Sequence, residues 1–187
     1  AEAAAMDPCQ RLLLEHGYAA LHAANIDRTA LVRSLTGVFI GFGGTGFGHV
    51  LAQSPAGGSV YAATGSAPSI ASGRLSYALG MHGPCVSYET ACSAALTACH
   101  AGLRALQLGE CTIGLVAGAS LMLAPDVGTS FAIAGMTSAR GRCHTFDVRA
   151  DGFARGEACG AVALRCGIAD EPISVCGSAV RQDGKSA

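Results

Sequence analysis

The chain has 187 residues, of which half are hydrophobic and only 13% are charged. This composition excludes an intrinsically disordered tail. Twelve Lys and Arg residues against thirteen Asp and Glu residues give a net charge of −1, and no basic cluster offers a surface for phosphate backbones, so nucleic acid is not an expected partner. For a chain of this length, such a high apolar content predicts an apolar surface that a second subunit, or the rest of a larger protein, covers.

The small-residue composition, with 26 Gly and no Trp, is typical of tightly packed α/β layers. The nine cysteines lie mostly in apolar runs and form no CxxC pair, which predicts reduced thiols in an intracellular compartment, cytoplasm or plastid, and no metal site. The first residues include no basic stretch followed by an apolar one, so we expect that they are not a secretory signal. Residues 34–73 lack charged side chains, but Gly, Ser, Thr and Pro interrupt them, so we expect no membrane span.

Helices and strands are predicted to alternate from the N-terminal end. Asp7 followed by Pro8 indicates the start of a helix over 8–24, because a carboxylate at the N-cap and a proline at the first helical position both favour it. The run TGVFIG at 36–41 predicts a buried strand. Helical spacing of apolar residues predicts a second helix over 68–80, ending at a glycine.

The second half of the sequence continues the same alternation. PCVSYE at 84–89 predicts a strand, and residues 92–108 predict a largely buried helix that follows it directly. Further strands are predicted over 111–123, 157–167 and 173–181. This order of elements predicts an α/β layered fold.

Cys92 lies at the predicted junction between this strand and this helix. The free N–H groups and the positive dipole end of a helix stabilise a thiolate, which would make Cys92 a nucleophile. The alternative is that Cys92 is only a small apolar residue at a tight junction. Position alone leaves both interpretations open.

Several motifs, in order, resemble the β-ketoacyl synthase (ketosynthase) domain of type I polyketide and fatty acid synthases, a member of the thiolase-like superfamily. The similarity runs from Met6 to the end of the chain. ETACSAAL at 89–96 resembles the nucleophile motif of the family, DTACSSSL. The other matching segments are MDPCQRLLLEHGYAAL at 6–21, GVFIG at 37–41, SIASGRLSYALGMHGP at 69–84 and GRCHTFDVRADGFARGEACGAVAL at 141–164.

The resemblance implies a decarboxylative condensation. Cys92 would accept an acyl chain from the phosphopantetheine arm of an acyl carrier protein, and its backbone N–H would contribute to the oxyanion hole. A malonyl carrier thioester would then lose carbon dioxide and attack the acyl group. Phe131 and Met136 align with the region lining the acyl pocket, although ordinary core positions would explain them equally well. No directly bound cofactor is expected, and the implied partners are the carrier protein, a second copy of the domain and the rest of a multidomain synthase.

Four residues depart from the family pattern. Glu89 replaces an aspartate, and Ala94 and Ala95 replace two serines; these changes alter packing without removing the nucleophile. Ala158 stands where the family has glycine, and it would be strained if the backbone there had a positive φ.

The two histidines that support decarboxylation in the family have no counterpart, because the chain contains no HGTGT motif and no GH motif after it. His100 lies eight residues after Cys92 on the same predicted helix, about 12 Å along the helix axis, and cannot replace them. The remaining histidines are predicted in surface helices or loops; they are His16, His22, His49, His82 and His144.

We expect an incomplete α/β/α thiolase-like fold, with residues 1–187 forming one partial ketosynthase domain that has no internal boundary. The first strand and most of the second half of the family fold are absent, and the second half would start near 170–187. Because the absent strand would lie centrally, we expect an unpaired interior sheet edge and low stability. As a fragment, the chain is predicted to be inactive alone. The alternative function is a non-catalytic structural or binding subunit derived from a ketosynthase.

Gly41, Gly43 and Gly46 match the dinucleotide-binding pattern GxGxxG after a predicted strand. No acidic residue follows in the window to Gly73, where such a site would place the one that binds the ribose. A dinucleotide site is therefore not expected.

Overall fold

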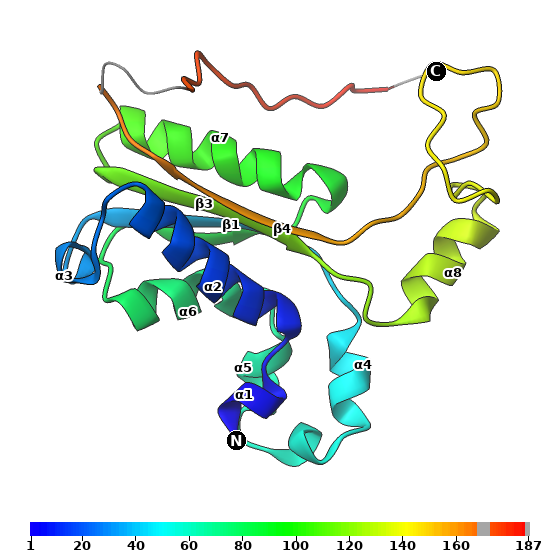
Figure 1. Cartoon of the computed structure of the whole chain (residues 1–187), viewed down its shortest axis with the longest axis horizontal. Helices are drawn as coiled ribbons and strands as arrows, with labels where there is room; N and C mark the ends of the chain where they lie inside the picture. Colours follow the sequence, from blue (N-terminus) through cyan, green and yellow to red (C-terminus); the bar gives the residue numbers. More distant parts are fainter. Residues whose placement is uncertain (168–172, 186–187) are drawn as a thin grey trace.

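The computed structural model describes residues 1–167 and 173–185. Its centre is a four-stranded sheet in the order β2-β1-β3-β4 (Figure 1). The strands are β1 (Thr36–Phe42), β2 (Cys85–Tyr88), β3 (Ile113–Ser120) and β4 (Ala158–Leu164). The first three are mutually parallel, and β4 is antiparallel to β3. The α/β layered fold predicted from the sequence is confirmed.

Three helices cover the two faces of this sheet. α2 (Pro8–Ala23) and α6 (Ile70–Leu79) lie on one face, and α7 (Ala94–Gln107) lies on the other (Figure 1). The predicted cap of α2 is present, since Asp7 accepts a hydrogen bond from the Cys9 amide at 2.7 Å. α6 ends as predicted at Gly80, which has a φ of 71°.

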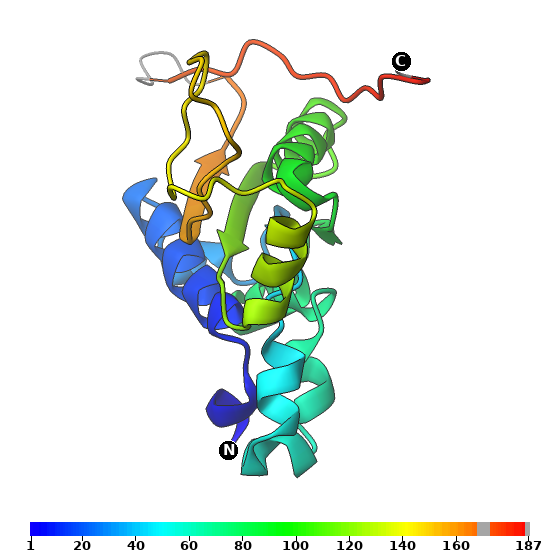
Figure 2. The same cartoon turned by 90° about the vertical axis from the view of Figure 1, so that its right-hand side faces the viewer.

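Seven shorter helices were not predicted. Each has nine residues or fewer, too few for a periodic apolar pattern to be distinctive. They are α1 (Glu2–Ala5), α3 (Arg28–Leu31), α4 (Phe47–Ala52), η1 (Pro55–Gly58), α5 (Ala62–Ser66), η2 (Ala91–Ser93) and α8 (Pro125–Ile133). Figure 1 shows α8 beyond the end of the sheet, and in Figure 2, which looks onto that end, α8 lies in front of the strands.

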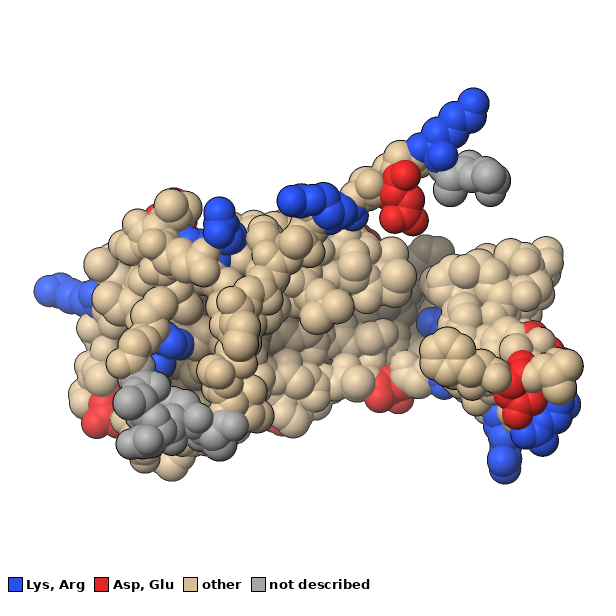
Figure 3. All heavy atoms as spheres, turned by 90° about the horizontal axis from the view of Figure 1, so that it is seen from above, with Lys and Arg blue, Asp and Glu red and all other residues tan. Residues whose placement is uncertain are grey.

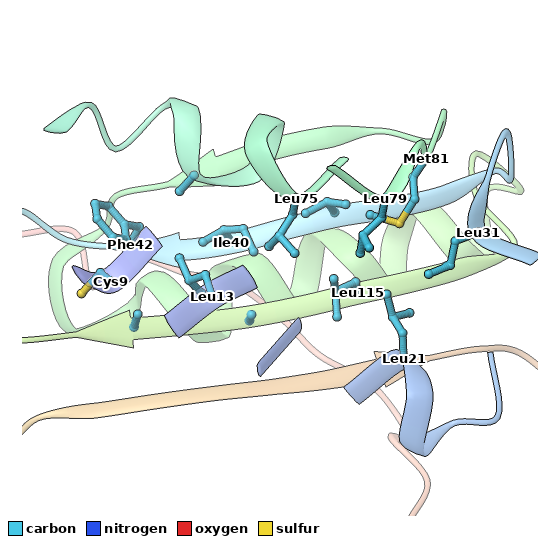
Figure 4. Packing of buried hydrophobic residues seen from close by; sticks show 14 of the residues in the cluster. Cys9, Leu13, Leu21, Leu31, Ile40, Phe42, Leu75, Leu79, Met81 and Leu115 are labelled. Atoms are coloured by element: carbon cyan, nitrogen blue, oxygen red, sulfur yellow. The ribbon is translucent and has the colours of Figure 1, made fainter. Parts of the chain in front are cut away.

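The hydrophobic core is divided between the two faces of the sheet. On the α2 and α6 side, Leu13, Leu75 and Leu115 are almost fully buried and pack together (Figure 4). On the α7 side, a smaller cluster joins Phe39 to the inner face of the helix. The apolar strands predicted from the sequence therefore separate two packed layers.

Two sequence-based expectations about single elements of this fold were wrong. Residues 173–181 form no strand, because they run along the surface with no neighbouring strand to pair with, and Ile173 is 84% exposed. α7 is not largely buried: it buries a small-residue face, while Leu96 on its other side is 75% exposed. The expected start of the second half, near 170–187, lies partly outside the described residues.

The third correction concerns the expected interior edge. In the described chain β1 and β3 pair directly, from Thr36 opposite Ile113 to Phe42 opposite Ala119. Pairing satisfies backbone N–H and C=O groups that would otherwise be unbonded inside the sheet. The sheet is therefore continuous, with β2 and β4 at its edges.

One exposed loop holds several charged side chains close together. On the face shown in Figure 3, acidic and basic side chains gather where residues 138–151 lie. This loop is held by ion pairs of Arg140 with Asp151 and of Arg149 with Asp147. Within the described ranges, no helix is long and apolar enough to cross a membrane.

Candidate active site

The candidate site lies at the edge of the sheet where the three parallel strands end. β1 leads into a glycine-rich loop at 43–46, β2 into the turn that carries Cys92, and β3 into the segment before α8. Carboxyl ends of parallel strands meet at one edge, so these three connections are neighbours. The topology thus brings together segments separated by about 80 residues in the sequence.

Cys92 lies in the tight turn η2, directly before α7. The preceding residue, Ala91, has a φ of 52°, a left-handed conformation that is uncommon for a residue with a Cβ atom. Ser93 stabilises the turn, because its hydroxyl donates to the Thr90 carbonyl at 2.8 Å. The Cys92 side chain is exposed at this sharp strand-to-helix junction, as a nucleophile that must meet a substrate requires.

Glycines at the ends of β1 and β3 let the first turn of α7 approach the sheet. A Cβ atom at Gly41 would lie 2.3 Å from the Ala95 nitrogen and 2.5 Å from the Ala94 carbonyl carbon. At Gly118, a Cβ atom would lie 2.9 Å from the Ala95 Cβ. The close approach of these backbones sets the position of the turn that carries Cys92.

The loop at 43–46 lies between the Cys92 turn and the start of α8. A Cβ atom at Gly44 would lie 4.0 Å from a carboxylate oxygen of Glu89, and one at Gly46 would lie 2.7 Å from the Ala124 Cβ. Of the three glycines in the GxGxxG match, Gly41 and Gly46 therefore allow close packing, whereas Gly43 has no atom within 4 Å of a Cβ position. The helix that follows them, α4, has only six residues.

A buried hydrogen bond fixes this loop to the N-terminus of α2. The Thr45 hydroxyl donates to Asp7 Oδ2 at 2.6 Å, and the other oxygen of Asp7 caps α2. Both side chains are buried. The cap residue identified from the sequence thus also positions a loop of the candidate site.

Replacing Thr45 with valine should lower the free energy of unfolding by about 1–3 kcal/mol, because it leaves a buried carboxylate oxygen without its donor. Urea denaturation measures the change. Thr29→Val is the matched control, since Thr29 donates to the N-cap Asp27 in an exposed pair and its loss should have a much smaller effect. Equal destabilisation by the two variants would contradict the role given to the buried pair.

The alanine replacements are accommodated at this site. Ala94 is buried, and Ala95 packs beside Gly118. Serines at these two positions would add hydroxyl groups that need hydrogen-bond partners, and the alanines avoid that need. Ala158 begins β4 opposite Ser120 and is not among the residues with positive φ. The strain considered for Ala158 is therefore absent.

Phe131 lies on α8, and Met136 follows that helix. The Phe131 ring makes an edge contact with Phe153 at 6.3 Å, and the guanidinium of Arg155 lies 5.3 Å from its centroid. Neither Phe131 nor Met136 belongs to the hydrophobic core, and Met136 is 46% exposed. Their interpretation as ordinary core residues was wrong, and a pocket-lining role stays a prediction. No pattern in the sequence had indicated Arg155 as the partner of Phe131.

The histidines are distributed as the sequence predicted. His16, His22, His49 and His82 are exposed, and His144 lies half-buried in the loop before β4. His100, on α7, hydrogen-bonds through Nδ1 to the Ser178 hydroxyl at 2.8 Å. This contact joins α7 to the C-terminal segment and gives His100 a structural partner.

The nine cysteines are all free thiols, and burial divides them into groups of different reactivity. Removal from water, reinforced by the charge of Asp7, raises the pKa of Cys9 to about 12. Burial also raises the pKa of Cys111 and of Cys159. Raised thiol pKa values lower the thiolate fraction near neutral pH and therefore slow alkylation.

Brief treatment with iodoacetamide at pH 8 should modify Cys92 and leave Cys9, Cys111 and Cys159 intact. With a pKa of about 12, roughly one Cys9 side chain in ten thousand is ionised at this pH. Peptide mass spectrometry measures each site. Modification of Cys9 as fast as Cys92 would show that the candidate nucleophile has no special accessibility.

Comparison with known proteins identifies the family. The model of the β-ketoacyl synthase N-terminal domain matches residues 1–166. The chain belongs to the β-ketoacyl synthase family. Among curated relatives of this ketosynthase chain, a Streptomyces halstedii protein named polyketide synthase GfsB is 44% identical over 99% of the chain, and a mycocerosic acid synthase-like polyketide synthase of Mycolicibacterium smegmatis is 40% identical over the same share.

Solved ketosynthases share the fold. The ketosynthase from module 6 of the bacillaene synthase of Bacillus subtilis 168 superposes with a TM-score of 0.78 and 35% identity, covering 88% of this chain and 28% of that one. An oxazolomycin ketosynthase domain of Streptomyces albus gives a TM-score of 0.75. The chain spans only 3% and 9% of the two curated relatives. The predicted resemblance and the partial thiolase-like fold are thus confirmed.

Proposed function

We propose that this chain supplies the nucleophile half of a ketosynthase that extends an acyl chain by decarboxylative condensation, within a longer polyketide or fatty acid synthase. The observation that carries the proposal is the position of Cys92, exposed in a strained turn between a parallel strand and a helix N-terminus. The motif ETACSAAL places the cysteine there. Family membership and relatives that are polyketide synthases support the same role.

In the proposed first step, the Cys92 thiolate attacks the carbonyl carbon of an acyl thioester carried by the phosphopantetheine arm of an acyl carrier protein. The tetrahedral intermediate places negative charge on the carbonyl oxygen, and the Cys92 backbone N–H is one proposed donor to it. The carrier thiol leaves, and the acyl group remains on Cys92 as a thioester. The chain needs no cofactor of its own for this transfer.

In the second step, a malonyl carrier thioester releases carbon dioxide, and the resulting carbanion attacks the acyl carbonyl carbon. The Cys92 thiolate leaves, and the product is a 3-oxoacyl carrier thioester two carbons longer. Donors for the enolate oxygen would come from two histidines in the part of the domain that this sequence does not include. Phe131 and Met136 are proposed to line the acyl pocket.

A homodimer and the rest of a multidomain synthase are proposed as further partners. The outer edge of β2 has no neighbour in the described sheet, and Val86 on this strand is 39% exposed, so a strand of a second copy could pair there. The chain spans only a small share of each polyketide synthase that it resembles, which supports a place within a larger synthase.

Nine free thiols support an intracellular, reducing compartment.

A second candidate function is a non-catalytic subunit derived from a ketosynthase. The observation in its favour is that His100, on the helix that follows Cys92, is engaged in a hydrogen bond to Ser178. Retention of an exposed cysteine in a strained turn opposes it, because a structural role needs neither the thiol nor the strain.

The deciding experiment uses the complete polypeptide that contains this chain, supplied with acyl and malonyl carrier proteins. Liquid chromatography with mass spectrometry should detect the extended 3-oxoacyl thioester, and Cys92→Ala should abolish it. Cys85→Ala, at another exposed thiol, is the matched control and should retain activity. No product from the unmodified protein would favour the non-catalytic subunit, and full activity of Cys92→Ala would remove the proposed nucleophile.

A further inference from the structure

α8 is attached to the rest of the molecule by unusually few contacts. It contains no buried residue, and Figure 1 shows it beyond the end of the sheet, away from α2, α6 and α7. A nine-residue helix with no buried face has little intrinsic stability in water. Its position must therefore be fixed by specific contacts at its surface.

Those contacts come from the segment that enters β4. The Phe153 amide donates to the Met136 carbonyl at 3.0 Å, which ties this segment to the residues after α8. The rings of Phe131 and Phe153 meet edge to face. Arg155 then places its guanidinium over the Phe131 ring, 5.3 Å from the centroid. Phe131 is thus held between an aromatic edge and a cation.

Arg155 also approaches the backbone of α8. One of its terminal nitrogens would lie 3.1 Å from a Cβ atom at Gly128, one turn before Phe131. It borders a shallow hollow of about 370 Å³ formed with the segment after β3 and the start of α8. In the described ranges Arg155 forms no ion pair with a carboxylate. The contact that the structure shows for its guanidinium charge is therefore the Phe131 ring.

We propose that Arg155 is a positioning residue, which selects among acyl chains by fixing the Phe131 ring. This inference rests on the proposed function, in which Phe131 forms part of the acyl pocket wall. With the guanidinium in place, the ring has one orientation and the wall has a defined depth. Without it, the ring can rotate on an otherwise loosely attached helix, and longer acyl chains gain room. Arg155 itself touches no reacting atom.

The test measures acylation of the complete ketosynthase polypeptide by short and long acyl thioesters, for example butanoyl and decanoyl N-acetylcysteamine, using intact-protein mass spectrometry. Arg155→Met should raise the ratio of the long-chain to the short-chain rate about threefold, the size expected from losing one cation–π contact at a partly exposed site. Phe131→Leu should shift the ratio in the same direction. The double variant should add no further shift, since both changes remove one interaction.

Two variants act as controls. Arg155→Lys keeps a cation near the ring and should stay within twofold of the unmodified ratio. Arg142→Met removes the same charge from an exposed position in the preceding loop and should change nothing. Alkylation of Cys92 by iodoacetamide should be equal in all variants, which shows that the nucleophile turn is intact.

The failures of the two proposals are distinguishable. If the unmodified protein never becomes acylated, the proposed function fails and the positioning role fails with it. If acylation occurs but Arg155→Met lowers both rates equally, or the shifts of the two single variants add, Arg155 has no role in selecting chains and only the further inference is overturned.

Discussion

Replacing Gly41 with alanine should destabilise the protein by about 3 kcal/mol and reduce acylation of Cys92 about a hundredfold. The added methyl group would lie 2.3 Å from the Ala95 nitrogen, so the first turn of α7 must move away from β1. Backbone atoms cannot rotate aside as a flexible side chain does. Because Cys92 lies two residues before α7, the displacement would move its thiol from the position in which we propose that it accepts the acyl group.

Gly43→Ala is the matched control for this change. Gly43 lies two residues after Gly41, has no atom within 4 Å of a Cβ position and is not among the glycines with positive φ. It should retain stability and acylation. Thermal unfolding and timed acylation of the complete domain measure both effects. An unchanged Gly41→Ala protein would contradict the close approach of β1 to α7.

The 187-residue chain alone is expected to release no carbon dioxide from labelled malonyl carrier protein. Decarboxylation produces an enolate whose oxygen needs preorganised donors, and loss of one such donor typically costs about a hundredfold or more. Of the histidines in this chain, His100 already bonds Ser178, and four others are exposed.

Cys92→Ala and the chain unfolded in urea provide the background for this assay. Release clearly above both backgrounds would show that a residue within the 187 supplies the missing donor, with His100 or His144 the first to test. Activity of the complete polypeptide together with background release by the chain alone would support the division of catalysis between its two parts.

Local signals in the sequence predicted the principal elements of the fold. The Asp7–Pro8 start of α2 and the Gly80 end of α6 are set by capping chemistry within a few residues. The apolar runs of β1 and β3 were recognisable because burial on both faces requires continuous hydrophobic residues. These features depend on neighbours in the chain, so the sequence alone was sufficient.

The wrong expectations concern partners distant in the chain. Residues 173–181 have a strand-like composition, but a strand also needs a neighbour with free hydrogen-bonding groups, and none of the described strands pairs with them. The direct pairing of β1 with β3 likewise depends on the whole sheet. Within the candidate site, the motif and its position before a helix predicted Cys92 as the nucleophile, and this assignment stays a prediction. The contact of Arg155 with Phe131 was not predicted, because nothing adjacent to Arg155 in the sequence indicates Phe131 as its partner.

The most direct test of the account locates the acyl group itself. The complete ketosynthase polypeptide is incubated with an acyl carrier thioester, digested without reducing agent and analysed by peptide mass spectrometry. The account predicts that the acyl mass appears on the peptide containing Cys92 and disappears in Cys92→Ser treated in the same way. Acylation at another cysteine, such as the exposed Cys85 or Cys143, with Cys92 unmodified, would contradict the assignment of Cys92 as the nucleophile.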